Sequence, residues 1–357
     1  MAKQLPLLAL TTGDPLGIGP EVMVKALVKP EATSKARLLG VGSVGVLERT
    51  AEQLGVPVRF NPVDSPGDAR FKPGELDVME LGLTGLEHLA PGQVEALAGK
   101  ASVDYVIRAA ELALAGEVDG VVTGPIHKEA VQAGGYSQYI GNTEILEDVC
   151  TRHTGHNYHG QCMTMLITKN LRVAHATRHI PFRDIASHLT EKRLTETVLL
   201  TAAGMTSLGF PQARIAVAGL NPHNGEHGMI GREEVEMITP LLKKLRESGL
   251  NVVGPVPADS IFFKAIAGEY DAVIALYHDQ GHIAIKVHGF EESITVSLGL
   301  PVIRTSVDHG TAFDIVGQGI ASEKGMVAAL ELAAQVVEAG TWNAGLRQSG
   351  IRPAAMA

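Results

Sequence analysis

The segment DHGTAFDIVGQGIA, residues 308–321, carries the residue types best suited to binding a cofactor. Its three glycines let main-chain N–H groups approach a ligand closely, and the Asp314 carboxylate can accept a hydrogen bond from a ribose or an adenine. Apolar side chains beside it can wall a flat ring: Ala312, Phe313 and Ile315. A glycine-rich turn before the C-terminal helix is the alternative, because short motifs also arise by chance.

Three histidines far apart in the sequence share one position relative to the predicted strands. His179, His223 and His278 each follow an apolar, strand-like run, among glycines and prolines. Because the carboxyl ends of parallel strands meet at one edge of a sheet, they can be neighbours in space. Three neutral imidazoles leave a divalent cation with open positions for substrate oxygens. The pattern predicts a catalytic metal site, although each residue alone could be a hydrogen-bonded loop histidine.

The other histidines receive structural interpretations. We interpret His153, His156 and His159 as parts of a solvated polar loop, and His175 as a core residue or a neighbour of the metal ligands. His282 lies four residues after His278, but we expect Gly281 to interrupt any helix that would align the two rings.

Polar and cationic residues near other predicted strand ends could hold an anion. Thr143 lies where a helical pattern begins and offers a hydroxyl and an amide. Lys286, Thr295 and Arg304 are predicted after or within strands, and the two cations could bind a carboxylate or a phosphate unless they are ordinary surface charges.

The segment GDPLGIGPE, residues 13–21, follows a strand and opens a helix, where an anion or ribose site often lies. It lacks the third glycine of a Rossmann fingerprint, because Val22 stands there, and the chain has no phosphate-binding P-loop motif. A tight turn whose glycines merely pack is the alternative.

Length and composition restrict the class of protein. A chain of 357 residues predicts two domains or one large α/β unit. The net charge of −9, without a Lys/Arg-rich block, argues against a nucleic-acid partner and favours a small-molecule substrate. With two cysteines and no apolar run of membrane-spanning length, we expect no signal peptide and no membrane contact, and a soluble cytoplasmic protein.

Apolar runs of strand length alternate with helical periodicity, which predicts an α/β fold with mostly parallel sheets. The expected strands are residues 5–10, 38–41, 120–123, 163–168, 172–177, 214–218, 272–276 and 294–297. The expected helices are residues 20–28, 102–115, 189–208, 232–248 and 323–339. We interpret residues 61–91 as a long excursion or a small antiparallel element.

Several segments together resemble one family over nearly the whole chain. HGTAFDIVG is similar to the adenine-binding HGSAPDIAG loop of isocitrate and isopropylmalate dehydrogenases. GDPLGIGPE, TGPIHKEAV, ATRHIPFRDI, GLNPHNGEHGMIGREE, PADSIFF, YHDQGHIAIK and SLGLPVIRTS, in that order, resemble the 4-hydroxythreonine-4-phosphate dehydrogenase family of vitamin B6 biosynthesis and its catabolic paralogues. The resemblance implies a two-lobed α/β/α sandwich of the isopropylmalate dehydrogenase type, with a cleft between lobes. We expect residues 1–127 with 300–357 to form the cofactor lobe, and 128–299 the metal-binding and dimer-forming lobe.

Site residues carried over from the family agree with the motifs above. The resemblance places one divalent metal, Zn, Mg, Co or Mn, on His179, His223 and His278, and substrate on Asn142, Thr143, Lys286, Thr295 and Arg304. NAD is expected on His309, Gly310, Thr311, Ala312 and Asp314. Asp259 and Lys128 are the candidate proton acceptors. A homodimer whose active sites take residues from both chains is also implied.

Two positions depart from the biosynthetic members, which have His where this chain has Asn142 and Asn where it has Thr295. The reaction expected is metal- and NAD-dependent oxidation, with decarboxylation, of 4-hydroxythreonine 4-phosphate or of threonate or erythronate 4-phosphate. A cis-dihydrodiol dicarboxylate from aromatic acid breakdown is an alternative substrate. A metal-dependent hydrolase, or a binding protein that has lost activity, is the alternative of another class.

Overall fold

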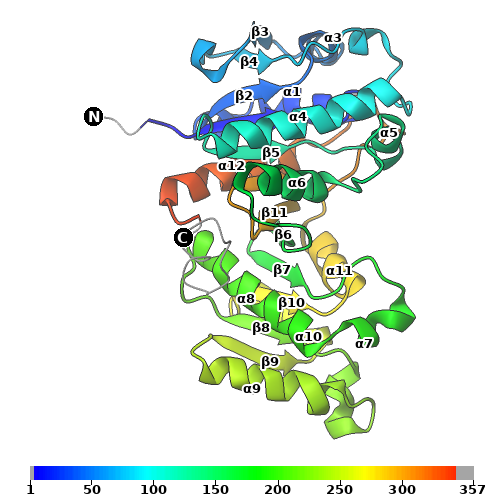
Figure 1. Ribbon diagram of the computed structural model, residues 1–357, viewed down its shortest axis with the longest axis vertical. Coiled ribbons are helices and arrows are strands. Elements are labelled where there is room, and N and C mark those ends of the chain that lie inside the picture. Colours follow the sequence, from blue (N-terminus) through cyan, green and yellow to red (C-terminus); the bar gives the residue numbers. More distant parts are fainter. Residues whose placement is uncertain (1–3, 343–357) are drawn as a thin grey trace. The chain divides into compact units, whose positions relative to one another are not determined.

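The computed structural model describes residues 4–342, and the chain divides into two compact units (Figure 1). The first unit comprises Met1–Cys162 and Leu300–Gly340, and the second contains Met163–Gly299. The predicted boundary before residue 300 coincides with this division, whereas residues 128–162 lie with the first unit instead of the second. Residues 343–357, which we assigned to the cofactor lobe, lie outside the described residues.

The first unit is a parallel sheet between two layers of helices (Figure 1). Its strands run in the order β3 (Arg59–Val63), β4 (Glu75–Met79), β2 (Arg37–Val41), β1 (Leu7–Thr11), β5 (Gly120–Thr123) and β12 (Arg304–Val307), and each neighbouring pair is parallel. One layer contains α4 (Ala96–Leu114), α5 (Lys128–Ala133) and α6 (Asn142–Thr154), and the other α1 (Gly19–Ala26), α3 (Val44–Leu54) and α12 (Lys324–Ala339). Short helices α2 (Pro30–Thr33), η1 (Pro66–Asp68) and η2 (Leu86–His88) lie in its connections.

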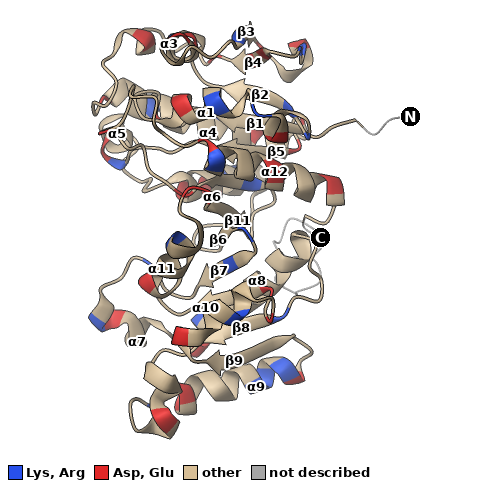
Figure 2. Ribbon diagram, turned by 180° about the vertical axis from the view of Figure 1, so that it is seen from behind, with Lys and Arg blue, Asp and Glu red and all other residues tan. Residues whose placement is uncertain are grey.

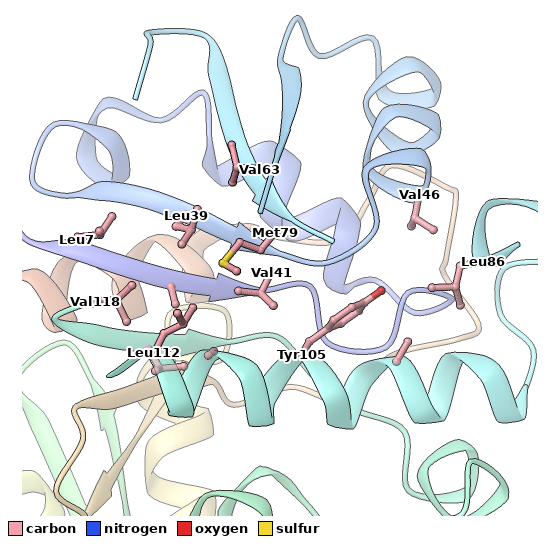
Figure 3. Packing of buried hydrophobic residues seen from close by; sticks show 14 of the residues in the cluster. Leu7, Leu39, Val41, Val46, Val63, Met79, Leu86, Tyr105, Leu112 and Val118 are labelled. Atoms are coloured by element: carbon pink, nitrogen blue, oxygen red, sulfur yellow. The ribbon is translucent and has the colours of Figure 1, made fainter. Parts of the chain in front are cut away.

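Both faces of this sheet are covered, which explains why its central strands are continuously apolar in sequence. Leu7, Leu39 and Val41 from the strands pack against Tyr105 and Leu112 of α4 in one buried cluster (Figure 3). This core holds the carboxyl ends of β1 and β5 in place, and the loops that follow them carry the candidate site residues of the unit.

The second unit contains a mixed sheet with helices on both faces. Its strands run in the order β11 (Ile294–Leu298), β6 (Met163–Thr168), β7 (Leu171–His175), β10 (Ala272–Ala275), β8 (Ile215–Ala218) and β9 (Val252–Val256). β6 is antiparallel to both of its neighbours, and the pairs from β7 to β9 are parallel. Its helical segments are η3 (Phe182–Asp184), α7 (Ile185–His188), α8 (Glu191–Ser207), η4 (Pro222–Gly228), η5 (Glu234–Ile238), α9 (Thr239–Glu247), α10 (Ala258–Ile266) and α11 (His278–Gly289).

The structure corrects the expectation for residues 61–91. This part of the chain adds β3 and β4 to the sheet as parallel strands, and is neither an excursion nor an antiparallel element. Pro62 lies in β3, which is tolerated because β3 is the outermost strand of this unit's order. β12 was also missed because its sequence, Arg-Thr-Ser-Val, is polar although all four residues are buried.

Lys and Arg positions (blue) and Asp and Glu positions (red) are interspersed along the ribbon in Figure 2. Within residues 4–342, none of the helices is both long enough and apolar enough to cross a membrane.

Candidate active site

A buried arginine anchors the candidate substrate site of the first unit. Arg304 begins β12 and is 4% exposed. Its Nε and Nη2 atoms donate to Thr123 Oγ1, at 3.0 and 2.7 Å. Burial lowers the pKa of the guanidinium to about 10, so it still carries its charge at neutral pH. Such a charge, taken out of water, favours an anionic ligand.

Asn142 joins the same cluster from the first position of α6. Its Nδ2 donates to Thr123 Oγ1 at 3.4 Å and to the carbonyl oxygen of Gly124 at 3.3 Å. The Gly124 carbonyl can only accept, which determines the orientation of the amide. Asn142 Oδ1 is therefore the atom left over, and it is buried without a hydrogen-bond partner among residues 4–342. With Thr143 next to it at the start of α6, the predicted pair lies where an anion can meet helix N–H groups and Arg304.

The candidate cofactor loop is held by the turn that follows β1. Ile18 N donates to Thr311 O at 3.0 Å, and a Cβ on Gly17 would lie 2.9 Å from the Thr311 side chain. Ala312 has a φ of 41°, an uncommon backbone conformation that often marks functional loops. Asp314 is exposed, Thr311 is buried, and the Nδ1 of His309 lies 2.9 Å from Gly310 O. The loop thus has a constrained backbone and an accessible carboxylate.

One candidate residue was missed by the sequence analysis. Asp14 is fully buried after β1, and its Oδ1 accepts a hydrogen bond from Leu16 N at 2.9 Å. Its Oδ2 is buried and has no hydrogen-bond partner within residues 4–342. Burial raises the pKa of this carboxyl to about 6. The glycines of GDPLGIGPE are not its only signal, because an Asp between Gly13 and Pro15 at the end of a strand also indicates a site residue.

We expect Asp14→Asn to stabilise the protein at neutral pH. The folded-state pKa of about 6 exceeds the ordinary value of 3.8, so ionising Asp14 costs folding free energy that rises as the pH passes through this interval. At about 1.36 kcal/mol per pKa unit, the variant should gain up to about 3 kcal/mol above pH 6.5 and almost nothing below pH 4. Urea unfolding at pH 4 and pH 7.5 measures this. The prediction is wrong if the variant and the unmodified protein have the same free energy of unfolding at both pH values.

In the second unit, two of the three predicted metal ligands lie close together. His278 begins α11 directly after β10, and its ring centroid is 5.6 Å from that of His179. The Nδ1 of His278 lies 2.7 Å from Asp279 Oδ1, which favours a proton on Nδ1 and leaves Nε2 to accept a cation. This is the usual outer-shell arrangement of a metal-binding histidine.

The expectation for His282 and Gly281 was wrong. α11 continues through Gly281, and the rings of His278 and His282 stack with centroids 3.7 Å apart. Gly281 is required for close packing, because a Cβ there would lie 2.2 Å from His175 Nε2. His175 is 1% exposed, and burial keeps its pKa well below 6.5. It is therefore a neutral core residue beside the histidine pair.

His223 lies in a strained segment after β8. Residues 223–227 all have positive φ, with 51° at His223, which costs about 1 to 2 kcal/mol per non-glycine residue. Glu234 supports the segment's entry, because its Oε1 accepts from Leu220 N and Asn221 N, each at 2.7 Å. Asn224 Nδ2 donates to Pro255 O at 2.9 Å. Strain maintained by several bonds is typical of functional sites.

Among the described residues, no three His, Cys, Asp or Glu side chains of this chain form a metal-binding group. His179 and His278 come together, and His223 is exposed in its own loop. Asp259, in the first turn of α10, and Lys128, at the start of α5, are both exposed. His153, expected in a loop, lies in the last turn of α6.

Lys286 and Thr295 occupy neighbouring elements of the second unit. Lys286 lies in helix α11, the element after strand β10, and its Nζ donates to Ser293 Oγ at 3.3 Å. Thr295 lies in β11 opposite Leu166 and is partly exposed.

The chain has a buried guanidinium and a constrained glycine loop in one α/β unit and paired imidazoles in the other. These features are typical of an enzyme that acts on a small anionic substrate. The family model of the pyridoxal phosphate biosynthetic protein PdxA matches residues 34–333. A relative from Symbiobacterium thermophilum, provisionally named D-threonate 4-phosphate dehydrogenase, is 42% identical over 334 residues, 94% of this chain and 97% of the relative. This chain belongs to the PdxA family.

Solved structures agree with this membership. The crystal structure of 4-hydroxythreonine-4-phosphate dehydrogenase from Klebsiella pneumoniae matches with a TM-score of 0.81 and 37% identity, over 93% of this chain and 99% of that one. A terephthalate 1,2-cis-dihydrodiol dehydrogenase from Burkholderia xenovorans matches with a TM-score of 0.62 and 29% identity, over 93% and 98%. These relatives confirm the predicted two-lobed α/β fold and a dehydrogenase, instead of the hydrolase alternative.

Proposed function

We propose that this chain is an NAD-dependent, divalent-metal-dependent dehydrogenase that oxidises the secondary hydroxyl of a phosphorylated 3-hydroxy acid. D-threonate, erythronate and 4-hydroxythreonine 4-phosphates are the candidate substrates. The observation that carries the proposal is the buried Arg304 beside Thr123 and the start of α6, in a chain similar to dehydrogenases of phosphorylated four-carbon acids. A guanidinium and helix N–H groups suit a phosphate or carboxylate.

His179, His223 and His278 would hold the metal, and Asp279 supports this because it orients the His278 ring. A bound divalent cation supplies Lewis acidity, which lowers the pKa of a substrate hydroxyl. NAD would accept a hydride from the carbon that bears this hydroxyl, and the β-keto acid formed could then lose CO₂. Asp259 and Lys128 are exposed and remain the candidates that take up the hydroxyl proton.

We further propose a homodimer with shared active sites. α10 and α11 expose large apolar side chains: Phe263 is 73% exposed, Ile283 62% and Val287 84%. A pocket between these helices is walled by the same residues. Contiguous apolar surface of this kind is typical of protein interfaces. Because His278 begins α11, a second copy packed on this face would lie next to the proposed metal ligands. The described residues of one chain do not form a group of three ligands, so the second copy could supply the missing one.

A screen of NAD reduction tests the proposed function. Purified protein is assayed with each four-carbon phosphate and a cis-dihydrodiol dicarboxylate, with Mg²⁺, Mn²⁺, Co²⁺ or Zn²⁺, and after chelation. We expect turnover of a phosphorylated acid, lost on chelation, with NAD preferred over NADP because the Asp314 carboxylate repels a 2′-phosphate. Equal use of NADP, or no turnover of any substrate with any metal, would argue against the proposal.

The departures at Asn142 and Thr295 predict a substrate other than 4-hydroxythreonine 4-phosphate. An amide cannot become cationic, so a charge-assisted hydrogen bond worth about 1.5 to 3 kcal/mol is lost, which lowers kcat/KM by about tenfold or more. Asn142→His with Thr295→Asn should raise kcat/KM for 4-hydroxythreonine 4-phosphate and lower it for the best substrate of the unmodified enzyme. Highest efficiency of the unmodified enzyme on 4-hydroxythreonine 4-phosphate would show that the two changes are neutral.

A further inference from the structure

The buried carboxyl of Asp14 is more than a turn residue. Only its Oδ1 stabilises the turn, by accepting from Leu16 N. A Ser or Asn side chain could accept the same hydrogen bond without placing an ionisable group in the interior. The Oδ2 atom has no partner within residues 4–342, and an unsatisfied buried acceptor is costly to keep. The chain therefore retains an acceptor that no described group uses.

Asp14 is tied to the segment that carries His127. Asp14 N donates to Pro125 O at 2.8 Å, and a Cβ on Gly13 would lie 2.2 Å from the same oxygen, so the two loops are in close backbone contact. His127, two residues beyond Pro125, interacts electrostatically with the Asp14 carboxyl and lowers its pKa in part. The three groups occupy one small region after β1 and β5.

A flat aromatic surface lies in this region. The rings of His127 and Phe313 stack with centroids 4.4 Å apart and planes 11° apart. His127 Nδ1 accepts from Ala130 N at 3.4 Å at the start of α5, so a neutral ring carries its proton on Nε2. Phe313 belongs to the candidate cofactor loop. Both rings are partly exposed, so a ligand that approaches this loop meets aromatic surface, and the backbone of the loop that carries His127 contacts that of Asp14.

We propose that Asp14 and the His127–Phe313 pair form the subsite for a heteroaromatic ring of the cofactor, with Asp14 Oδ2 accepting a hydrogen bond from an exocyclic N–H group of that ring. The proposal rests on the proposed NAD dependence. Both rings of NAD offer this chemistry, through the amino group of adenine or the carboxamide of nicotinamide. A phosphate is excluded because it offers only acceptors to a carboxylate. Because Oδ2 is buried in this structure, the proposal includes a rearrangement of the loop at 309–317 that brings the ring to this oxygen.

Dinucleotide analogues and one isosteric variant test the subsite. Binding of NAD, nicotinamide hypoxanthine dinucleotide, which lacks the adenine amino group, and nicotinic acid adenine dinucleotide, which lacks the carboxamide, is measured by calorimetry. In Asp14→Asn, the Leu16 N–H can donate only to the amide oxygen, which therefore occupies the position of Oδ1. The amide nitrogen then occupies the position of Oδ2, so a donor replaces an acceptor. We expect the wild type to bind one analogue at least tenfold more weakly than NAD, and the variant to reduce this difference below about threefold.

The weakened analogue identifies the ring: the hypoxanthine analogue indicates adenine, and the nicotinic acid analogue indicates nicotinamide. Phe313→Leu, which removes the flat ring only, should weaken NAD binding several-fold. Asp119→Asn is the matched control. The Asp119 carboxylate accepts from Leu7 N at the start of β1, at the opposite end of the strand from Asp14, so this substitution should leave the binding of all three dinucleotides unchanged. Equal wild-type affinity for all three dinucleotides, or unchanged discrimination in Asp14→Asn, overturns the subsite alone. No binding of NAD by the wild type overturns the proposed cofactor together with the subsite.

Discussion

Replacing His223 by Ala is expected to abolish stoichiometric binding of a divalent cation and to reduce turnover by about 10²-fold or more. A Lewis acid that stabilises developing charge is worth several kcal/mol, and removal of one of three ligands releases it. The strained backbone at residues 223–227 supports this expectation. The His223 side chain is exposed, so its packing does not compensate for the free energy of the strain, whereas a functional role of the ring would explain it. Metal content by atomic emission and kcat at saturating metal give the two measurements.

His227→Ala is the matched control for this experiment. His227 is exposed in the same left-handed segment, with a φ of 58°, so both substitutions place Ala in the same unfavourable conformation. Their effects on stability should therefore be similar, whereas only the His223 variant should lose metal. Full metal occupancy and full activity in His223→Ala would exclude His223 as a ligand.

Replacing Arg304 by Met should lower kcat/KM for the phosphorylated substrate by at least about 10²-fold. Met has a similar length and leaves no charge in the buried site, so folding should be retained or improved. The substrate would lose up to two charge-assisted hydrogen bonds, each worth about 1.5 to 3 kcal/mol. Arg304→Lys keeps the charge but lacks the planar guanidinium, so its kcat/KM should lie between those of Arg304→Met and the unmodified enzyme.

Arg214→Met provides the control for a general effect of losing an arginine. Arg214 forms a two-point contact with Asp271 in the second unit, with Nε and Nη2 at 3.0 Å from the two carboxylate oxygens. Its loss should leave kcat/KM unchanged and change the stability little, as for other surface ion pairs. Equal kcat/KM of Arg304→Met and the unmodified enzyme would remove Arg304 from the substrate site.

The sequence by itself determined most of the strands and helices that carry the site. Buried parallel strands are continuously apolar, so β5 and β6 were predicted with their exact bounds and β8 and β10 within one residue. The family motifs determined the chemistry expected, because glycine loops, histidines at strand ends and an arginine within apolar sequence each have few functional explanations. Polar or proline-containing strands such as β12 and β3 were missed, since their burial depends on partners far along the chain.

Only the tertiary structure decided how individual side chains are used. Asp14 is separated from Pro125 and Phe313 by more than a hundred residues, so its orphan oxygen and aromatic neighbours follow from loop packing alone. Gly281 predicted a helix break by its intrinsic preference, yet close approach of His175 requires glycine inside α11. Local sequence determines which conformations a segment prefers, whereas the burial, pairing and charge state of a side chain depend on groups that meet only when the chain has folded.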